Sequence, residues 1–296
     1  MFDIKALYEA FSVEEATRLL LEHPEARVMA GGSDNLIKIR EGKLANREFV
    51  SIYMIDELRE IKLEEDGTLR IGSLCSFTQV ASDPLVLKLV PTLAKAVSLV
   101  GGPQVRNIGT IGGNTCNGIT SADSGATLVA YDAEVELHGA EGLRRLPLRD
   151  FYKGVGKVYL RPGEIQVAIR IPRSSYEGYV GEYIKYAMRE AMDIATLSCS
   201  VNLRLSEDKK TVEDLRIAYG VAAPVPTRAL AAEAAGKGQP LDQNFIPKVL
   251  AHITEGLSPR ESWRASQAFR LHLIKATAKR ALETVLQRSG VSLGKK

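Results

Sequence analysis

Two glycine-rich segments constrain this chain more than any other feature of its sequence. The first is Ala30-Gly31-Gly32-Ser33-Asp34, which follows the apolar pair Val28-Met29. The second covers residues 101–118 and holds six glycines, where average usage predicts about one. Glycine lets the backbone approach a neighbour closely and lets successive N–H groups converge. Because Ser, Thr, Asn and Asp residues flank both segments, we predict a pair of ligand-binding loops, with irregular turns as the alternative.

Neither segment matches the common nucleotide-binding patterns. The chain has no Gly-x4-Gly-Lys-Ser/Thr and no Gly-x-Gly-x-x-Gly, so neither a P-loop nor a Rossmann-type NAD site is expected. The four histidines form no metal-binding pattern, and three cysteines are too few for an iron–sulfur cluster. Cys116, inside the second segment, is expected to be a small buried residue rather than a redox thiol. We assign no catalytic residue and no metal ligand.

Charge and composition argue against nucleic acid and membranes as partners of this chain. The formal net charge of +3 is too small to indicate binding to nucleic acid or to an anionic membrane. No stretch approaches the roughly 20 apolar residues of a membrane span, and the N-terminus does not resemble a signal peptide. Three widely separated cysteines do not suggest a disulfide framework. These features predict a cytoplasmic protein.

The pattern of elements predicts an α+β chain of two domains, residues 1–176 and 177–296, joined near 172–178. In the first domain, strands are expected at 27–30, 49–52, 68–73, 133–138 and 164–171, with helices at 34–40 and 85–100 and a capping box at 12–15. In the second, strands are expected at 183–189, 194–205 and 215–221. Helices are expected there at 228–236, 243–254 and 263–287.

The glycine segments also resemble those of a known family. Ala30 to Asp34, together with Gln104-Val105-Arg106-Asn107-Ile108-Gly109-Thr110-Ile111-Gly112-Gly113-Asn114, resembles the FAD-binding subunits of molybdenum hydroxylases. Residues 185–195, 220–224 and 258–266 are similar to the separate FAD subunit of bacterial xanthine dehydrogenases. The resemblance implies an N-terminal, two-lobed α/β FAD-binding domain of the vanillyl-alcohol-oxidase/PCMH type. It also implies a C-terminal domain of antiparallel sheet and helices, of the CO dehydrogenase flavoprotein type.

The resemblance further implies which residues bind FAD. The first loop would contribute Arg27, Val28, Met29, Ala30, Gly31, Gly32, Ser33 and Asp34 around the diphosphate, and the second Thr110, Ile111, Gly112, Gly113 and Asn114. Single positions would be Val100, where the family often has an aromatic residue, Asp123, Ile165 (or its neighbour Gln166) and Lys185. Three of these positions have an alternative from their local pattern: Asp123 could cap a helix, Lys185 could be an exposed lysine, and Ile165 could be core.

By the same resemblance the chain is an electron-transfer subunit. A large molybdenum-cofactor subunit would hydroxylate hypoxanthine or xanthine, and a small [2Fe–2S] subunit would deliver the electrons to FAD on this chain, with NAD⁺ as the acceptor. The alternatives are the FAD subunit of another molybdenum hydroxylase, acting on nicotinate, an aldehyde, carbon monoxide or another purine, or a non-catalytic assembly protein. A stand-alone reductase resembling the cell-wall enolpyruvyl reductases is less favoured, because no catalytic acid is evident.

Overall fold

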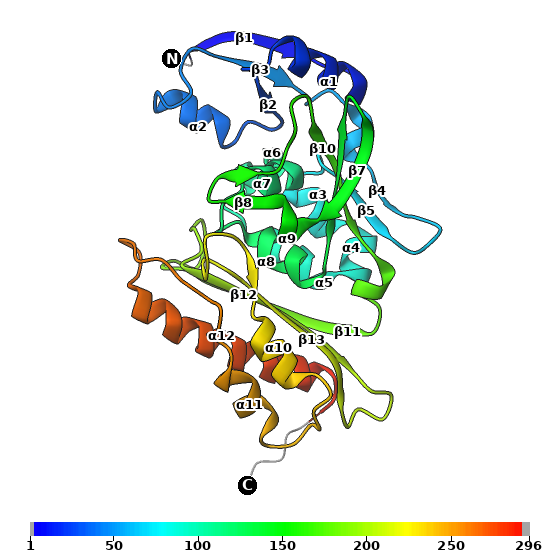
Figure 1. The fold of residues 1–296 in the computed structure, drawn as a ribbon, viewed down its shortest axis with the longest axis vertical. Helices are drawn as coiled ribbons and strands as arrows, with labels where there is room; N and C mark the ends of the chain where they lie inside the picture. The colour runs from blue at the N-terminus through cyan, green and yellow to red at the C-terminus, as the bar shows by residue number, and fades with distance from the viewer. Residues whose placement is uncertain (1–2, 292–296) are drawn as a thin grey trace.

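A computed structural model describes residues 3–291 of the chain. It consists of three bodies that follow one another along the long axis of the molecule (Figure 1). A small N-terminal lobe is followed by a larger second lobe, and the C-terminal domain lies beyond it. No helix in the described part of the chain is both long and apolar enough to cross a bilayer.

The first lobe is a parallel sheet of three strands in the order β1-β3-β2. Its elements are β1 (Ile4–Glu9), β2 (Arg27–Met29), β3 (Arg47–Ser51), α1 (Val13–Glu22), α2 (Asn35–Arg40) and the 3₁₀ turn Asp56–Arg59. The predicted capping box forms only in part. The Ser12 hydroxyl accepts the N–H of Glu15, but the Glu15 carboxylate accepts from Phe11 rather than from Ser12.

The second lobe contains a five-stranded antiparallel sheet in the order β4-β5-β10-β6-β7. Its strands are β4 (Ile61–Leu63), β5 (Leu69–Gly72), β6 (Glu134–Gly139), β7 (Gly142–Pro147) and β10 (Ile165–Ile171), with the separate hairpin β8 (Tyr152–Gly154) and β9 (Lys157–Val158). Its helices are α3 (Phe77–Ser82), α4 (Pro84–Leu89), α5 (Pro91–Ser98), α6 (Pro103–Ile108), α7 (Ile111–Cys116), α8 (Asp123–Ala130) and α9 (Leu148–Phe151). They pack with the sheet around the largest core cluster of this lobe.

The C-terminal domain is an antiparallel sheet, β11-β12-β13-β14, with helices on one face and the second lobe on the other. Its elements are the 3₁₀ turn Arg173–Ser175 at its entry, β11 (Tyr179–Tyr186), β12 (Leu197–Leu205), β13 (Val212–Gly220), β14 (Thr227–Arg228), α10 (Leu230–Gly236), α11 (Phe245–Ala251) and α12 (Gln267–Arg288). The side chains of β12 point alternately to these two faces. Cys199, Val201 and Leu203 join the core under α12, while Asn202 approaches Thr92 of α5 around Gly181.

Most predicted elements exist, and their ends differ for local reasons. The helix expected at 85–100 is divided into α4 and α5, because Pro91 has no N–H to continue the first helix and begins the second instead. The strands expected at 183–189 and 194–205 are separated by a longer irregular segment, residues 187–196. Several elements give no clear sequence signal; these are β1, β4, β7, β8, β9, β14, α3, α6, α7 and α9.

Candidate cofactor site

The first glycine segment is a short connection from β2 to α2. Gly32 has a φ of 72°, a left-handed conformation that glycine adopts without strain. Among residues 3–291, no acceptor is found for the backbone N–H groups of the four consecutive residues Gly31, Gly32, Ser33 and Asp34. Consecutive backbone N–H groups that donate to no protein acceptor can bind the oxygens of an anionic group, especially beside the start of a helix.

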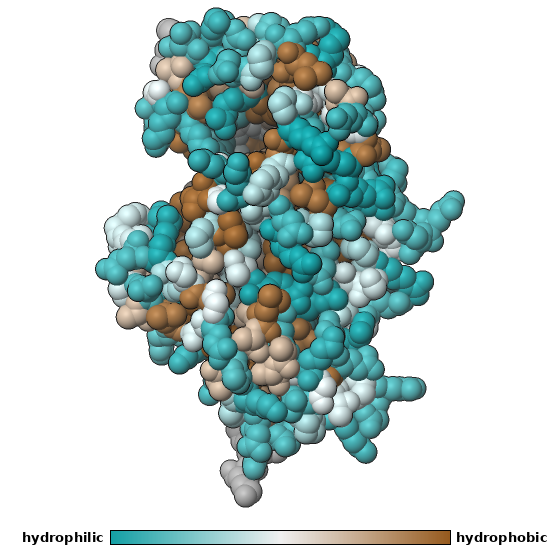
Figure 2. Space-filling view, in the orientation of Figure 1, coloured by the Kyte–Doolittle hydropathy of each residue, from teal (hydrophilic) through white to brown (hydrophobic). Residues whose placement is uncertain are grey.

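The two glycine segments touch each other. A Cβ at Gly31 would lie 1.7 Å from the carbonyl oxygen of Ile108, the last residue of α6. That separation is far shorter than any non-bonded contact, and the obstacle is backbone, so only glycine fits at position 31. The first lobe and the second lobe therefore meet where the two segments meet. Figure 2 shows a notch in the surface between the N-terminal lobe and the rest of the molecule.

The second segment differs from the expectation that its N–H groups converge on a ligand. The N–H groups of Ile111, Gly112, Gly113 and Asn114 all donate within the protein, to the carbonyls of Cys75, Ser73 and Thr110 and to the Thr110 hydroxyl. Gly112 is needed for packing instead, since its Cβ would lie 2.5 Å from the Cβ of Ser73. The segment builds α7, with Thr110 as its N-cap, and offers side chains rather than backbone donors.

A cavity of about 210 Å³ lies beside α7 and brings several predicted residues together. Val100, Asn114 and Asp123 line it, although they come from three different segments of the second lobe. The other lining residues are not among the site residues predicted from the sequence. These are Gly101, Asn117, Ile119, Ser121, Ala122, Met192, Asp193 and Ile194. The last three belong to the irregular segment 187–196, so the C-terminal domain closes one side of the cavity.

Asp123 and Lys185 form a buried ion pair between α8 and β11. Lys185 Nζ lies 2.8 Å from Asp123 Oδ2 and 2.9 Å from the carbonyl oxygen of Leu99, and the Tyr183 hydroxyl donates to Asp123 Oδ1 at 2.7 Å. Burial raises the pKa of Asp123 above its ordinary value, while the Lys185 ammonium and the Tyr183 hydroxyl act in the opposite direction. Both local alternatives are wrong: Lys185 is buried, and Asp123 makes no side-chain cap for α8.

The remaining predicted positions lie in different surroundings. Ile165 is buried in the core that joins α1, β3 and β10, so its core alternative is correct. Gln166 faces α7, where its Oε1 accepts from Thr115 at 2.8 Å and its buried Nε2 has no partner among the described residues. Arg27 is exposed, whereas Val28, Met29 and Ala30 are half-buried.

Cys116 is a partly buried residue that packs against the core of the second lobe, in agreement with the expectation of a small packing residue. Its Sγ lies 3.1 Å from Gln166 Oε1, and burial raises the pKa of the thiol to about 12. A thiol with so high a pKa is almost entirely protonated near neutral pH and is a poor nucleophile. Within residues 3–291, moreover, no group of three or more His, Cys, Asp or Glu side chains could hold a metal ion.

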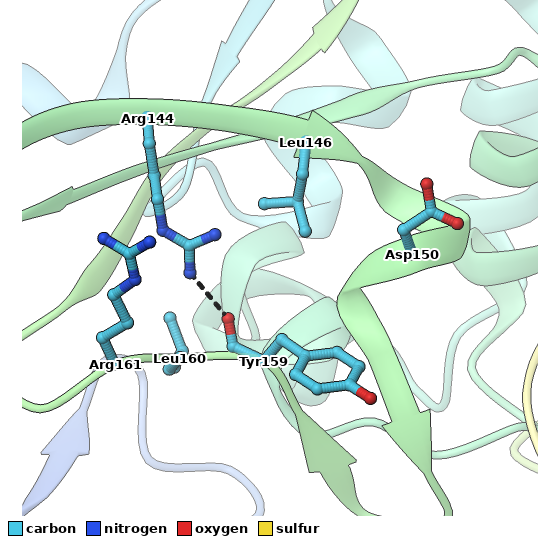
Figure 3. A pocket seen from close by; sticks show the side chains of 6 residues that line it. All are labelled: Arg144, Leu146, Asp150, Tyr159, Leu160 and Arg161. Carbon is cyan, nitrogen blue, oxygen red and sulfur yellow. Dashed lines mark hydrogen bonds between the residues drawn. The ribbon is translucent and has the colours of Figure 1, made fainter.

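A larger cavity, about 380 Å³, is found elsewhere and contains none of the predicted residues. It lies between β7 and the chain that leads to β10, and Figure 3 shows Arg144, Tyr159 and Arg161 around it. Both guanidinium groups already have carboxylate partners, Glu164 for Arg144 and Glu141 for Arg161. The positive charge at this cavity is therefore neutralised by the protein itself.

The residues beside α7 fit the demands of FAD, which is long, carries a diphosphate and presents many hydroxyls. Undonated N–H groups are available in the first segment, and glycine gives close access at position 31. Asn114, Ser121 and Asp123 place polar side chains around the adjoining cavity, while Val100 and Ile119 give it apolar walls. Neutral donors with little bulk suit such a cofactor better than a dense basic cluster would.

Comparisons with known proteins agree with this chemistry. Residues 2–174 match the model for the FAD-binding domain in molybdopterin dehydrogenase, and residues 182–285 match the CO dehydrogenase flavoprotein C-terminal domain. The boundary after residue 176 stays a prediction. The chain is 41% identical to the putative xanthine dehydrogenase FAD-binding subunit XdhB of Escherichia coli, over 99% of this chain and 100% of that protein.

Solved structures of the same architecture extend the comparison. Carbon monoxide dehydrogenase from Hydrogenophaga pseudoflava superposes with a TM-score of 0.91 at 31% identity, over 97% of this chain and 99% of that chain. Quinoline 2-oxidoreductase from Pseudomonas putida 86 superposes with a TM-score of 0.89 at 27% identity, over 97% and 98%. The chain therefore belongs to the FAD-binding flavoprotein subunits of the molybdenum hydroxylase family of oxidoreductases.

Proposed function

We propose that this chain is the electron-transfer subunit of a xanthine dehydrogenase-type molybdenum hydroxylase. It would receive electrons from the [2Fe–2S] clusters of a small partner subunit and deliver them to NAD⁺, while a large molybdenum-cofactor subunit oxidises hypoxanthine or xanthine. The observation that carries the proposal is the full-length likeness to a xanthine dehydrogenase FAD-binding subunit, together with intact glycine segments.

Within this proposal, the first glycine segment holds the diphosphate of FAD. The N–H groups of residues 31–34 would donate to its oxygens, since no acceptor within residues 3–291 competes for them. Thr110 and Asn114 would contact the opposite side, and Ile111, Gly112 and Gly113 would shape that wall. We assign Val100 and Asp123 to the adjoining cavity, with Lys185 orienting Asp123 and Ile165 packing behind the site.

Bound FAD supplies redox chemistry that no side chain here offers, because a flavin exchanges electrons singly or in pairs. The protein's own contribution is to bind and orient it and to limit water. Lys185 ties Leu99 to Asp123, which holds the backbone next to Val100 in place. Arg106 donates to the carbonyls of Val100 and Gly101 and fixes the same turn from the other side.

The first test uses the purified chain. We expect about one FAD per chain, reduction of an artificial dye with NADH as donor, and no oxidation of hypoxanthine. A colourless chain that takes up no added FAD would contradict the cofactor assignment. Purine oxidation by the chain alone would contradict the assignment of that reaction to a separate molybdenum subunit.

A second test addresses the substrate. The chain should be produced together with candidate molybdenum and iron–sulfur partner subunits from the same genome, and the assembled complex assayed with hypoxanthine, nicotinate, an aldehyde and carbon monoxide. Turnover of hypoxanthine with NAD⁺ supports the xanthine dehydrogenase assignment. Turnover of another substrate alone would keep the electron-transfer role and replace the substrate.

A further inference from the structure

Lys38 connects the two lobes at the place where the glycine segments meet. It belongs to α2 in the first lobe, yet its Nζ lies 3.0 Å from Oδ1 of Asn117, just after α7 in the second lobe. The same ammonium forms an ion pair with Asp34, one helical turn earlier. Asn117 in turn lines the cavity that contains Val100 and Asp123. The ammonium therefore contacts one residue of the first glycine segment and one residue that lines the cavity.

We propose that Lys38 binds the diphosphate of FAD through its free N–H and offsets the charge of Asp34 beside it; this inference rests on the function proposed above. An ammonium has three donors, and the structure gives two of them partners, Asp34 and Asn117. The Asn117 acceptor is a neutral amide oxygen, and charge-assisted bonds to phosphate are stronger than bonds to neutral acceptors. About a third of the Lys38 side chain is exposed, and no protein acceptor for its third N–H is found in the described part of the chain.

Lys38 also compensates for the negative charge of Asp34 in the first segment. The four N–H groups of residues 31–34 are neutral donors, and the carboxylate of Asp34 beside them repels an anion. By pairing with Asp34, Lys38 cancels that repulsion, and it still has one N–H to donate. A diphosphate can then approach a segment whose local charge is balanced.

The competing explanation is that Lys38 only ties the two lobes together. That function needs the bond to Asn117 but no phosphate. It predicts that removing either side chain weakens every flavin equally, whether or not the flavin carries a diphosphate.

The experiment compares Lys38→Met, Lys38→Arg and Asn117→Leu with the parent chain. Lys43→Met is the matched control, since Lys43 is an exposed lysine just after α2 that pairs only with Glu41 in the described structure. Dissociation constants for FAD and for riboflavin, which has no phosphate, are measured by fluorescence quenching on the flavin-free chain. The FAD titration is repeated at low and high salt, and thermal unfolding of each variant is recorded.

We expect Lys38→Met to weaken FAD binding by about tenfold to hundredfold, to leave riboflavin binding unchanged, and to reduce the salt dependence of FAD binding. Lys38→Arg should restore part of the loss, and Lys43→Met should behave like the parent chain. Equal losses for FAD and riboflavin, or an unchanged salt dependence, would overturn the role of Lys38. A parent chain that binds no FAD at all would instead overturn the proposed function, so the two failures are distinguishable.

Discussion

At residue scale, Gly31 matters because it has no side chain. The carbonyl of Ile108 occupies the space where a Cβ would be, and the contact joins two lobes that are distant in sequence. A larger residue would have to push α6 away from the first segment, and with it the N–H groups of residues 31–34. Close approach at one glycine thus sets the geometry of the candidate site.

Gly31→Ala is therefore expected to abolish stoichiometric FAD binding and to lower the thermal unfolding temperature. Gly42→Ala is the control, because Gly42 has a φ of 78° but open space around its Cα. That control should cost about 1 kcal/mol of stability from backbone strain alone and leave FAD binding intact. Flavin content after gel filtration and thermal melts check both variants, and normal flavin content in Gly31→Ala would refute the steric argument.

At the scale of elements, the five-stranded sheet is held partly by a buried carboxylate. Glu136 on β6 is nearly inaccessible, and its oxygens lie 3.1 Å from Arg70 Nε on β5, 2.8 Å from Arg145 Nε on β7 and 3.5 Å from Arg170 Nη1 on β10. Burial alone would raise the pKa of Glu136, but hydrogen bonds from Arg145 and Arg70 outweigh it and lower the pKa. One carboxylate thus links four strands.

This lowered pKa predicts a pH dependence of stability. The contribution of Glu136 is fully present above its unfolded pKa of about 4.5, and it is lost as the pH falls through the lower pKa of the folded state. Glu136→Gln should cost about 3 kcal/mol near neutral pH, and the difference from the parent chain should shrink at acid pH. Glu60→Gln, which breaks an exposed pair with Lys62, is the control. Urea unfolding across this pH range measures the effect, and a pH-independent difference would contradict it.

At the scale of the whole molecule, Glu182 joins the C-terminal domain to the second lobe. It lies on β11, is almost fully buried, and pairs with Lys95 of α5 and with Arg288 of α12, the latter at 2.6 Å. Both cations are about half exposed, whereas the carboxylate is not. Removing the two half-exposed cations and removing the buried carboxylate should therefore change the free energy of unfolding by different amounts.

We expect the double variant Lys95→Met/Arg288→Met to cost about 3–5 kcal/mol, because it leaves a buried carboxylate with no cationic partner and only the N–H of Tyr183 as a donor. Glu182→Gln should cost less, since both cations can then be hydrated. Denaturant unfolding followed by fluorescence compares the two. A larger loss for Glu182→Gln than for the double variant would contradict this asymmetry.

Local patterns in the sequence were sufficient for much of this molecule. Alternation of apolar residues predicted the three long strands of the C-terminal domain, and the glycine segments indicated a candidate site. These signals depend on backbone geometry and on the periodicity of burial, which neighbouring residues determine. Short strands such as β4 and β9 escaped prediction, because two or three residues are too few to show a period.

The partners of charged side chains were decided only by the tertiary structure. Lys185 has the pattern of an exposed strand residue, yet Asp123, far away in the sequence, lies against it and the two are buried together. Lys38 likewise bonds to Asn117 only because the lobes meet at Gly31. Residues 192–194 reach the cavity only because the connection from β11 to β12 lies beside the start of α8. Local sequence determines which backbone conformation is favourable and which face is apolar. Electrostatic and steric partners depend on which distant segments pack together, and no local pattern contains that information.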